Sequence, residues 1–310
     1  MNNRLSIEYI LGLINTDGSI YLDFKEDKSM PIKYALRPVL QISQQELNMH
    51  VLEKVKETLE TYKVKSFISC TRGENKTRRS PRLKVEGIKN VRKCFDLFDK
   101  SKTTLFGLKL IDYLLLKEIY ALIDSFLHNT KEGRQKVIDL KCHFHEPPVL
   151  PIELESNYIR RGVVKRQPKE KPSANRYSRE TWEDKHEFDR GSTKEAGKSE
   201  ISTVYQLYYQ HCSQVLRGVK LHKEFVKGIF DGDGCIFNSS KTDVDCQFTF
   251  DNGNESLFLA LADFFSDKEP CIYGRPGSQV YVIRREEIIK GCQLLFQDLL
   301  THKRRISLPT

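Results

Sequence analysis

The spacing of apolar residues divides the chain into helical and extended stretches. From Ser6 to Asp17 apolar residues recur at intervals of three and four, which predicts a helix with Ser6 as its N-cap. Gly18 then suits the left-handed backbone that commonly closes a helix. Polar and apolar residues alternate over 19–25 and 36–44, which predicts two strands with one buried and one solvated face each.

The same patterns predict the remaining elements, and the order of the first half recurs in shorter form in the second. The other elements of the first half are strands near 65–72 and 80–86 and helices over 45–62, 87–98 and 107–127. Those of the second half are helices over 221–232, 254–266 and 285–300 and strands near 234–239, 243–250, 269–274 and 279–284. Both halves therefore read as a helix, a hairpin, a helix, a hairpin and a closing helical segment.

A polar segment separates the two halves. Residues 147–200 are rich in Pro, Gly, Ser, Lys and Glu and have almost no apolar periodicity, so we expect an inserted linker. The expected organisation is a first half over 1–146 with extra C-terminal helices, this linker, and a second half over 201–310 that begins with a helix at 201–216.

A ten-residue block that occurs twice is the most informative local feature. Residues 9–18 read YILGLINTDG and residues 225–234 read FVKGIFDGDG, and each block runs into a strand-like segment. Gly12 and Gly228 lie in mid-helix, where glycine costs about 1 kcal/mol relative to alanine. The same cost in both copies indicates that the two helices pack closely through their glycines.

Such packing about a pseudo-twofold axis would bring Asp17 and Asp233 together at one end of the helix pair. Two neighbouring carboxylates form a hard oxygen site that suits Mg²⁺, and bound metal supports phosphodiester hydrolysis. A single Asp-Gly ending is an ordinary cap or turn, whereas two copies in register favour the metal-binding interpretation.

Charge and cysteine content narrow the environment and the partners. A net charge of +9, from 51 basic and 42 acidic residues, favours a polyanionic partner over a merely solvated basic surface, but does not separate DNA from RNA or an anionic membrane. The eight cysteines show no C-x-x-C spacing, so we expect reduced thiols in an intracellular protein. No apolar window approaches the roughly 20 residues of a membrane span, so we expect no membrane partner. The scarcity of alanine beside abundant Lys, Ile, Leu and Asn points weakly to an organellar gene, in a mitochondrion or chloroplast.

The paired blocks, the strands that follow them and the order of helices and hairpins resemble the LAGLIDADG family of homing endonucleases, specifically its two-motif monomeric class. The resemblance covers about residues 1–128 and 218–306. It implies an α+β fold of duplicated αββαββα halves, in which two antiparallel four-stranded sheets form a DNA-binding saddle. It also implies site-specific cleavage of double-stranded DNA at a long, partly palindromic target, with Mg²⁺ held by Asp17 and Asp233.

The resemblance assigns further residues to the active site. Gln44 resembles the polar residue that positions the water, whereas the second half has an aromatic residue there, with Asp251 or Asn252 as substitutes, so the two strands of DNA need not be cut equally. Lys109 and Lys303 resemble a lysine that stabilises phosphate charge. Their register is open by a residue or two, and the rival positions are Lys102, Arg304 and Arg305.

The first acidic position of the family's motif also differs between the two copies. It is Asn15 in the first motif and Asp231 in the second. Because this position serves mainly to cap and pack, the resemblance implies that the change has a mild effect on activity.

The solvated faces of the predicted strands carry side chains suited to reading bases in the major groove. In the first half these are Tyr21, Asp23, Lys25, Arg37, Gln41, Ser43, Arg72, Arg82 and Lys84. In the second half they are Asn238, Asp245, Gln247, Thr249, Arg275, Tyr281 and Arg284. Taken singly, each is also compatible with an ordinary solvated strand. Basic clusters at 72–79, 165–171 and 303–305 fit contacts to phosphate.

Three other interpretations have less support from the sequence. The scaffold could serve as an intron RNA maturase, with intron RNA as the partner, or as a non-catalytic DNA-binding protein; the presence of both motif aspartates favours the nuclease. Residues 142–146 and 211–212 contain zinc-ligand types, but without the paired spacing that closes a tetrahedral site.

Overall fold

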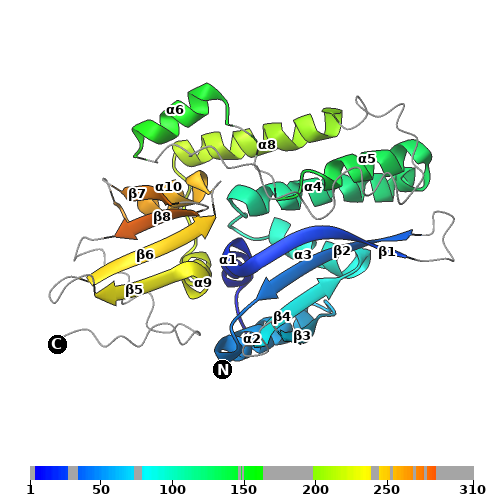
Figure 1. The fold of residues 1–310 in the computed structure, drawn as a ribbon, viewed down its shortest axis with the longest axis horizontal. Helices are drawn as coiled ribbons and strands as arrows, with labels where there is room; N and C mark the ends of the chain where they lie inside the picture. The colour runs from blue at the N-terminus through cyan, green and yellow to red at the C-terminus, as the bar shows by residue number, and fades with distance from the viewer. Residues whose placement is uncertain are drawn as a thin grey trace.

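Two four-stranded antiparallel sheets lie on either side of a central pair of helices (Figure 1). The structure is a computed structural model of the 310-residue chain. It describes residues 4–26, 34–72, 79–145, 148, 150–162, 198–238, 244–251, 254–267, 270–275 and 278–283. The central pair consists of α1 (Ile7–Asp17) and α9 (Lys223–Asp233), the two predicted motif helices.

The first half follows α1 with a sheet of strand order β1-β2-β4-β3. Its strands are β1 (Gly18–Glu26), β2 (Tyr34–Ser43), β3 (Phe67–Arg72) and β4 (Arg79–Glu86). Its helices are η1 (Glu46–Asn48), α2 (Met49–Thr61), α3 (Ile88–Asp99), α4 (Gly107–Asp124), η2 (Leu127–Asn129) and α5 (Lys131–Lys141).

The second half repeats this topology with the strand order β5-β6-β8-β7. Its elements after α9 are β5 (Gly234–Asn238), β6 (Val244–Asp251), α10 (Glu255–Phe264), β7 (Cys271–Arg275) and β8 (Ser278–Ile283). Two sheets with the same order and the same antiparallel pairing confirm the predicted duplicated α+β fold. The predicted helix over 285–300 lies outside the described residues.

Strand alternation sorts the side chains of the first sheet between the core and the outer face. Ile20 pairs with Leu40, and both are buried, whereas Asp23 and Arg37, which pair further along the same strands, are partly exposed. Because successive residues of a strand point to opposite faces, the apolar set packs on the helices and the polar set lines the other face.

The helices α4, α5 and α8 (Lys198–Leu216) lie together above the motif helices in Figure 1, with the short α6 (Ile152–Arg160) beside α8. We expected no helix within the linker at 147–200 because its apolar residues show little periodicity, so α6 was not predicted. Its Tyr158 is buried and donates a hydrogen bond of 2.9 Å to the Cys212 carbonyl of α8, so α6 belongs to the packed body. No helix in the described part of the chain has the length and apolar character to cross a bilayer.

The ends of α1 show why the sequence folds there. The Ser6 side chain accepts a hydrogen bond of 3.1 Å from the Tyr9 backbone N–H, as an N-cap does. The expectation that Gly18 is left-handed is wrong, because its φ is −88° and its ψ is 161°. A Cβ atom there would lie 2.4 Å from the Ile14 carbonyl oxygen, so glycine is required by close backbone packing and not by a positive φ.

Candidate active site

The two motif helices touch backbone to backbone. A Cβ atom added to Gly12 would lie 2.2 Å from the Phe225 carbonyl oxygen, and one added to Gly228 would lie 2.1 Å from the Tyr9 carbonyl oxygen. Neither position has room for any side chain, so the two glycines set the separation of the helices.

The C-terminal ends of the helices also meet. A Cβ atom on Gly232 would lie 1.9 Å from the Thr16 hydroxyl oxygen. Thr16 and Gly232 immediately precede Asp17 and Asp233, so both aspartates leave the helix pair at the same end. Each side chain is partly exposed, and a ligand can therefore reach it.

Equivalent motif positions make different polar contacts. The buried Asp231 accepts a hydrogen bond of 2.6 Å from the Tyr9 hydroxyl of the other motif helix. At the matching positions of the opposite motif stand Asn15 and Phe225, and Asn15 instead accepts a 2.7 Å hydrogen bond from the backbone N–H of Phe106. The Asn15 side chain thus anchors the start of α4. This contact holds the first motif in place although it has an amide where the second motif has the Asp231 carboxylate.

A chain of amides holds the first aspartate. The Gln44 amide donates to the Asp17 carboxylate, and its oxygen accepts a 3.2 Å hydrogen bond from Asn48, which is buried at the start of α2. Strand register makes the buried Phe250 the equivalent of Gln44 in the second half, so the two halves surround their aspartates differently. Asp251 ends β6, and Asn252 lies outside the described residues.

The two predicted lysines differ in what the structure shows. Lys109 lies in the first turn of α4, the turn that Asn15 anchors to the last turn of α1, and its side chain is partly exposed. Lys109 has no ion pair within the described part of the chain. Lys303 and its rivals Arg304 and Arg305 lie outside the described residues, whereas Lys102 is exposed beside α1, where its backbone N–H bonds Glu8.

The donor atoms at the helix ends fit a hard divalent cation. Asp17 and Asp233 each end a helix, where the carbonyl groups add partial negative charge to that of the carboxylate. Mg²⁺ usually keeps several waters and takes only one or two protein carboxylates together with substrate phosphates. The described residues contain no cluster of three or more His, Cys, Asp or Glu for a metal, which excludes a closed structural site among them but is compatible with this open arrangement.

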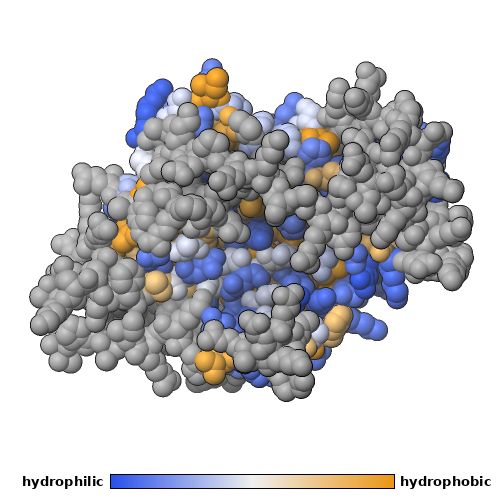
Figure 2. All heavy atoms as spheres, in the orientation of Figure 1, coloured by the Kyte–Doolittle hydropathy of each residue, from blue (hydrophilic) through white to orange (hydrophobic). Residues whose placement is uncertain are grey.

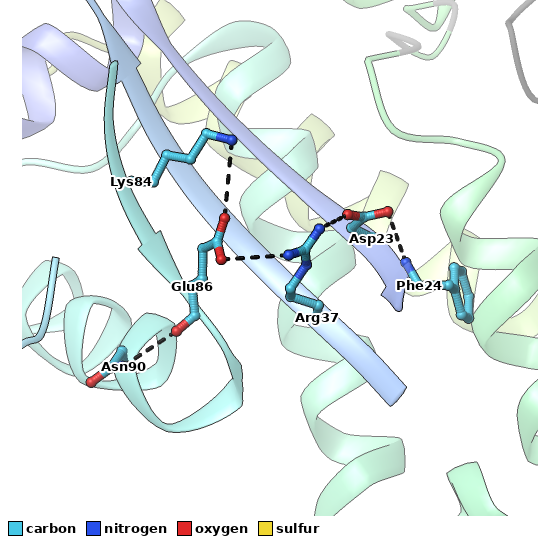
Figure 3. A network of polar contacts seen from close by, with 6 residues as sticks. All are labelled: Asp23, Phe24, Arg37, Lys84, Glu86 and Asn90. Carbon is cyan, nitrogen blue, oxygen red and sulfur yellow. Dashed lines mark hydrogen bonds and ion pairs between the residues drawn. The ribbon is translucent and has the colours of Figure 1, made fainter. Parts of the chain in front are cut away.

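The outer face of the first sheet carries a connected polar network (Figure 3). Arg37 pairs with Asp23 on the neighbouring strand and lies 3.6 Å from the Glu86 carboxylate, which in turn lies 4.0 Å from the Lys84 ammonium group. Because these side chains are 24 to 38% exposed, they are accessible to a ligand above the sheet.

All predicted readers of the first half except Arg72 share this face by register and remain partly or fully exposed. They are Tyr21, Asp23, Lys25, Arg37, Gln41, Ser43, Arg82 and Lys84. The side chain of Arg72, which pairs with Arg79 at the end of the hairpin, lies outside the described part.

Local environment changes the proton affinity of several groups at this sheet. The hydrogen bond from Arg37 to Asp23 raises the pKa of the guanidinium group. Burial, with a contribution from Asp23, raises the pKa of Tyr21. Burial lowers the pKa of Lys141 to about 8, and its ammonium group lies 4.5 Å from the centre of the Phe24 ring at the far end of β1.

The second sheet repeats one detail of the first. Gln41 donates to the Ser43 hydroxyl at 3.2 Å, and Gln247 at the equivalent position donates to the Thr249 hydroxyl at 2.8 Å.

The prediction that Tyr281 faces the DNA is wrong, because Tyr281 is fully buried and donates to Asp267 at 3.0 Å. The sequence of β8 is apolar on both faces, so alternation did not decide which face lies in the core.

The other predicted readers of the second half are described only in part. Asn238, Asp245 and Arg275 lie in β5, β6 and β7, but their side chains are outside the described part. Arg284 lies outside the described residues altogether.

Three residues that contact the predicted site residues were not predicted from the sequence. Glu86 continues the alternation of Arg82 and Lys84 and could have been identified from it. Asn48 and Tyr9 carry no such signal, since their importance depends on partners that the fold brings near.

The coloured surface in Figure 2 is mainly hydrophilic on the face shown, with scattered hydrophobic residues. The most exposed large hydrophobic residues, among them Leu47, Phe126 and Ile152, belong to different segments. This part of the surface is therefore suited to a polar partner.

The comparisons agree with this geometry. Residues 10–120 match the profile of the family described as LAGLIDADG endonuclease. "I-SmaMI bound to uncleaved DNA target in the presence of Calcium ions" matches with a TM-score of 0.60 and 16% identity over 97% of this chain and 87% of that chain. "I-SmaMI LAGLIDADG homing endonuclease bound to cleaved DNA" matches with a TM-score of 0.60 and 17% identity, over 97% of this chain and 85% of that chain. "LAGLIDADG Meganuclease I-CpaMI Bound to Uncleaved DNA" matches with a TM-score of 0.59 and 15% identity, over 97% of this chain and 87% of that chain. No curated protein sequence matches the chain.

Proposed function

We propose that this chain, whose residues 10–120 match the LAGLIDADG endonuclease profile, is a member of that family and a monomeric, site-specific endonuclease that hydrolyses one phosphodiester on each strand of a DNA duplex. The observation that carries the proposal is the glycine-mediated contact of α1 and α9, which delivers Asp17 and Asp233 to the same end of the helix pair. Relatives of the same fold have been solved with DNA, which supports DNA as the substrate.

In this proposal the two aspartates hold divalent cations, with Mg²⁺ as the physiological ion. When bound, such an ion acidifies the attacking water and stabilises the leaving oxygen. The buried Gln44, held by Asn48, fixes the orientation of the Asp17 carboxylate. Lys109 supplies positive charge near the scissile phosphate.

The outer faces of the two sheets read the DNA. Their donors and acceptors are suited to base edges in the major groove, and the basic side chains add contacts to phosphate. Because the two sheets present related but different side chains, the target is long and only partly palindromic. The net charge of +9 makes affinity fall as the salt concentration rises.

Replacement of the motif aspartates tests the proposal. Targets are first selected by cleavage of a randomised duplex library in Mg²⁺. We expect Asp17→Asn combined with Asp233→Asn to abolish cleavage of a selected target while binding, measured by mobility shift, is retained. The matched control is Asp124→Asn, because Asp124 also ends a helix but pairs with Arg92 on the surface.

Calcium gives a second arm, in which Ca²⁺ in place of Mg²⁺ should preserve binding and suppress cleavage. Cleavage by the double variant at the rate of the wild-type chain would reject the assignment of the aspartates. A wild-type chain that cuts no duplex in Mg²⁺ would reject the endonuclease itself.

A further inference from the structure

A cavity of about 270 Å³ lies beside the motif helix α1, and neither Asp17 nor Asp233 lines it. Its walls come from α1, the end of α3, the segment between α3 and α4, the first two turns of α4, and the last turns of α8 with the residues that follow. The apolar part of the wall includes Leu11, Leu105, Phe106 and Val219. A single water occupies roughly 10–15 Å³ by the same kind of measure, so the cavity has room for a small organic molecule.

Two residues of the cavity wall each contain a buried polar atom that has no hydrogen-bond partner among the described residues. These atoms are the hydroxyl oxygen of Thr103 and Nε2 of His211. The two residues are only 6% and 9% exposed. Buried polar groups in folded proteins are nearly always paired, because an unpaired one loses its hydration without compensation. Two such atoms on one cavity indicate that a ligand supplies the missing partners.

The imidazole of His211 is held in its neutral form. Burial lowers the pKa of His211 to about 4, and the Phe106 ring packs edge-on against it with 4.9 Å between ring centres. A neutral imidazole offers Nε2 as a donor or as an acceptor, depending on the tautomer. Thr103 likewise can donate or accept, so the pair matches a ligand edge that carries both kinds of group.

Positive charge lies at the mouth of the cavity. Lys102 and Lys220 both line it and are exposed, and Asp99, which also lines it, is paired with Lys117 at 3.0 Å. Neither Lys102 nor Lys220 forms an ion pair within the described part of the chain, so both are available for an anion. The ligand that fits combines an apolar body with hydrogen-bonding groups and a negative charge.

We propose that this cavity binds a nucleobase with its attached phosphate, with the base edge on Thr103 and His211 and the phosphate at Lys102 and Lys220. The base is either that of a free mononucleotide or an unpaired base of a single strand. Both sources present the same chemistry to the cavity. The site is separate from the paired aspartates, and its occupancy does not depend on cleavage.

Calorimetric titration of the full chain with AMP, GMP, CMP and UMP tests the proposal, with inorganic phosphate and ribose 5-phosphate as probes that lack the base. We expect at least one mononucleotide to bind and the two base-free probes to bind at least about tenfold more weakly. Thr103→Val and His211→Phe, which keep the shape but remove the polar atoms, should each weaken binding by about tenfold. Thr61→Val and His128→Phe, outside the cavity, serve as matched controls.

Thermal unfolding without ligand gives an independent readout. Because each cavity variant removes an unpaired buried polar atom, we expect Thr103→Val and His211→Phe to raise the melting midpoint, while the mononucleotide raises that of the wild-type chain most. A purely structural role for these side chains would instead lower the midpoint on substitution.

The two sources of the base are then separated with a short single-stranded oligonucleotide. If it competes with the mononucleotide and loses affinity on Thr103→Val, the site takes a base from a strand; if it does not compete, the ligand is the free mononucleotide. The Asp17→Asn, Asp233→Asn variant should bind the mononucleotide like the wild-type chain, which separates this proposal from the endonuclease. Absence of mononucleotide binding, or binding that neither cavity substitution weakens, would overturn it.

Discussion

Adding one methyl group at Gly12 is the sharpest test of how the motif helices are held together. In Gly12→Ala the new Cβ would lie 2.2 Å from the Phe225 carbonyl oxygen, 2.7 Å from the Ile229 nitrogen and 2.9 Å from the Gly228 Cα. All three are backbone atoms, so no side-chain rotation relieves the contact.

The expected magnitude follows from these distances. Ordinary contact begins at 3.4 Å, so the helices must separate by about 1.2 Å, the difference between 3.4 and 2.2 Å. Overpacking of this kind costs about 1–3 kcal/mol. The movement also breaks the 2.6 Å hydrogen bond between Tyr9 and Asp231, worth about 1.5–3 kcal/mol for a charged acceptor. Alanine favours the helix over glycine by about 1 kcal/mol, which offsets part of this cost. We therefore expect a net loss of about 1.5–5 kcal/mol in the free energy of unfolding.

Equilibrium denaturation in urea measures this loss, with Gly87→Ala as the control. Gly87 has a φ of +87°, and no atom of the described residues lies within 4 Å of the position that an added Cβ would take, so its substitution costs only backbone strain of about 1–2 kcal/mol. An unfolding free energy for Gly12→Ala within about 1 kcal/mol of the wild-type value would refute the close helix contact, and with it the geometry that joins the two aspartates.

Further predictions concern the other contacts. Tyr9→Phe removes the donor to the buried Asp231 and should destabilise the chain by about 1–3 kcal/mol, and adding Asp231→Asn should recover part of the loss in a double-mutant cycle of denaturation midpoints. The pKa of His211 falls from 6.5 in the unfolded chain to about 4 in the fold, so the unfolded state binds more protons between these two pH values. The contribution of His211 to the free energy of unfolding is therefore fully present above pH 6.5, and up to about 3 kcal/mol of it is lost as the pH falls to 4. His211→Phe should lack this part of the acid sensitivity, measured by denaturation at neutral and acidic pH, and equal slopes for both chains would contradict it. Arg37→Ala should change stability by less than about 1 kcal/mol, because its pair with Asp23 is about one-third exposed, yet it should weaken binding to the selected DNA target in a mobility-shift assay; a large loss of stability would show that the network is structural.

The outcomes at particular residues show how far periodicity reaches. Alternation placed Tyr21, Asp23 and Arg37 on the outer face because the polar residues of β1 and β2 lie mainly on one side of each strand. It failed at Tyr281, because β8 is apolar on both sides and the pattern is the same for either facing. Gly18 was assigned the wrong backbone conformation, since a glycine letter does not distinguish a positive φ from a lack of space for Cβ.

The sequence by itself determined the duplication, the class of each main element and the two aspartates that end the motif helices, because local spacing and an internal repeat are properties of the chain alone. Only the tertiary structure decided that Gln44 and Asn48 hold Asp17, that Tyr9 reaches Asp231, and that Thr103 and His211 share one cavity. The physical reason is distance along the chain: Tyr9 and Asp231 are 222 residues apart, and a hydrogen bond between them exists only after the two halves have packed.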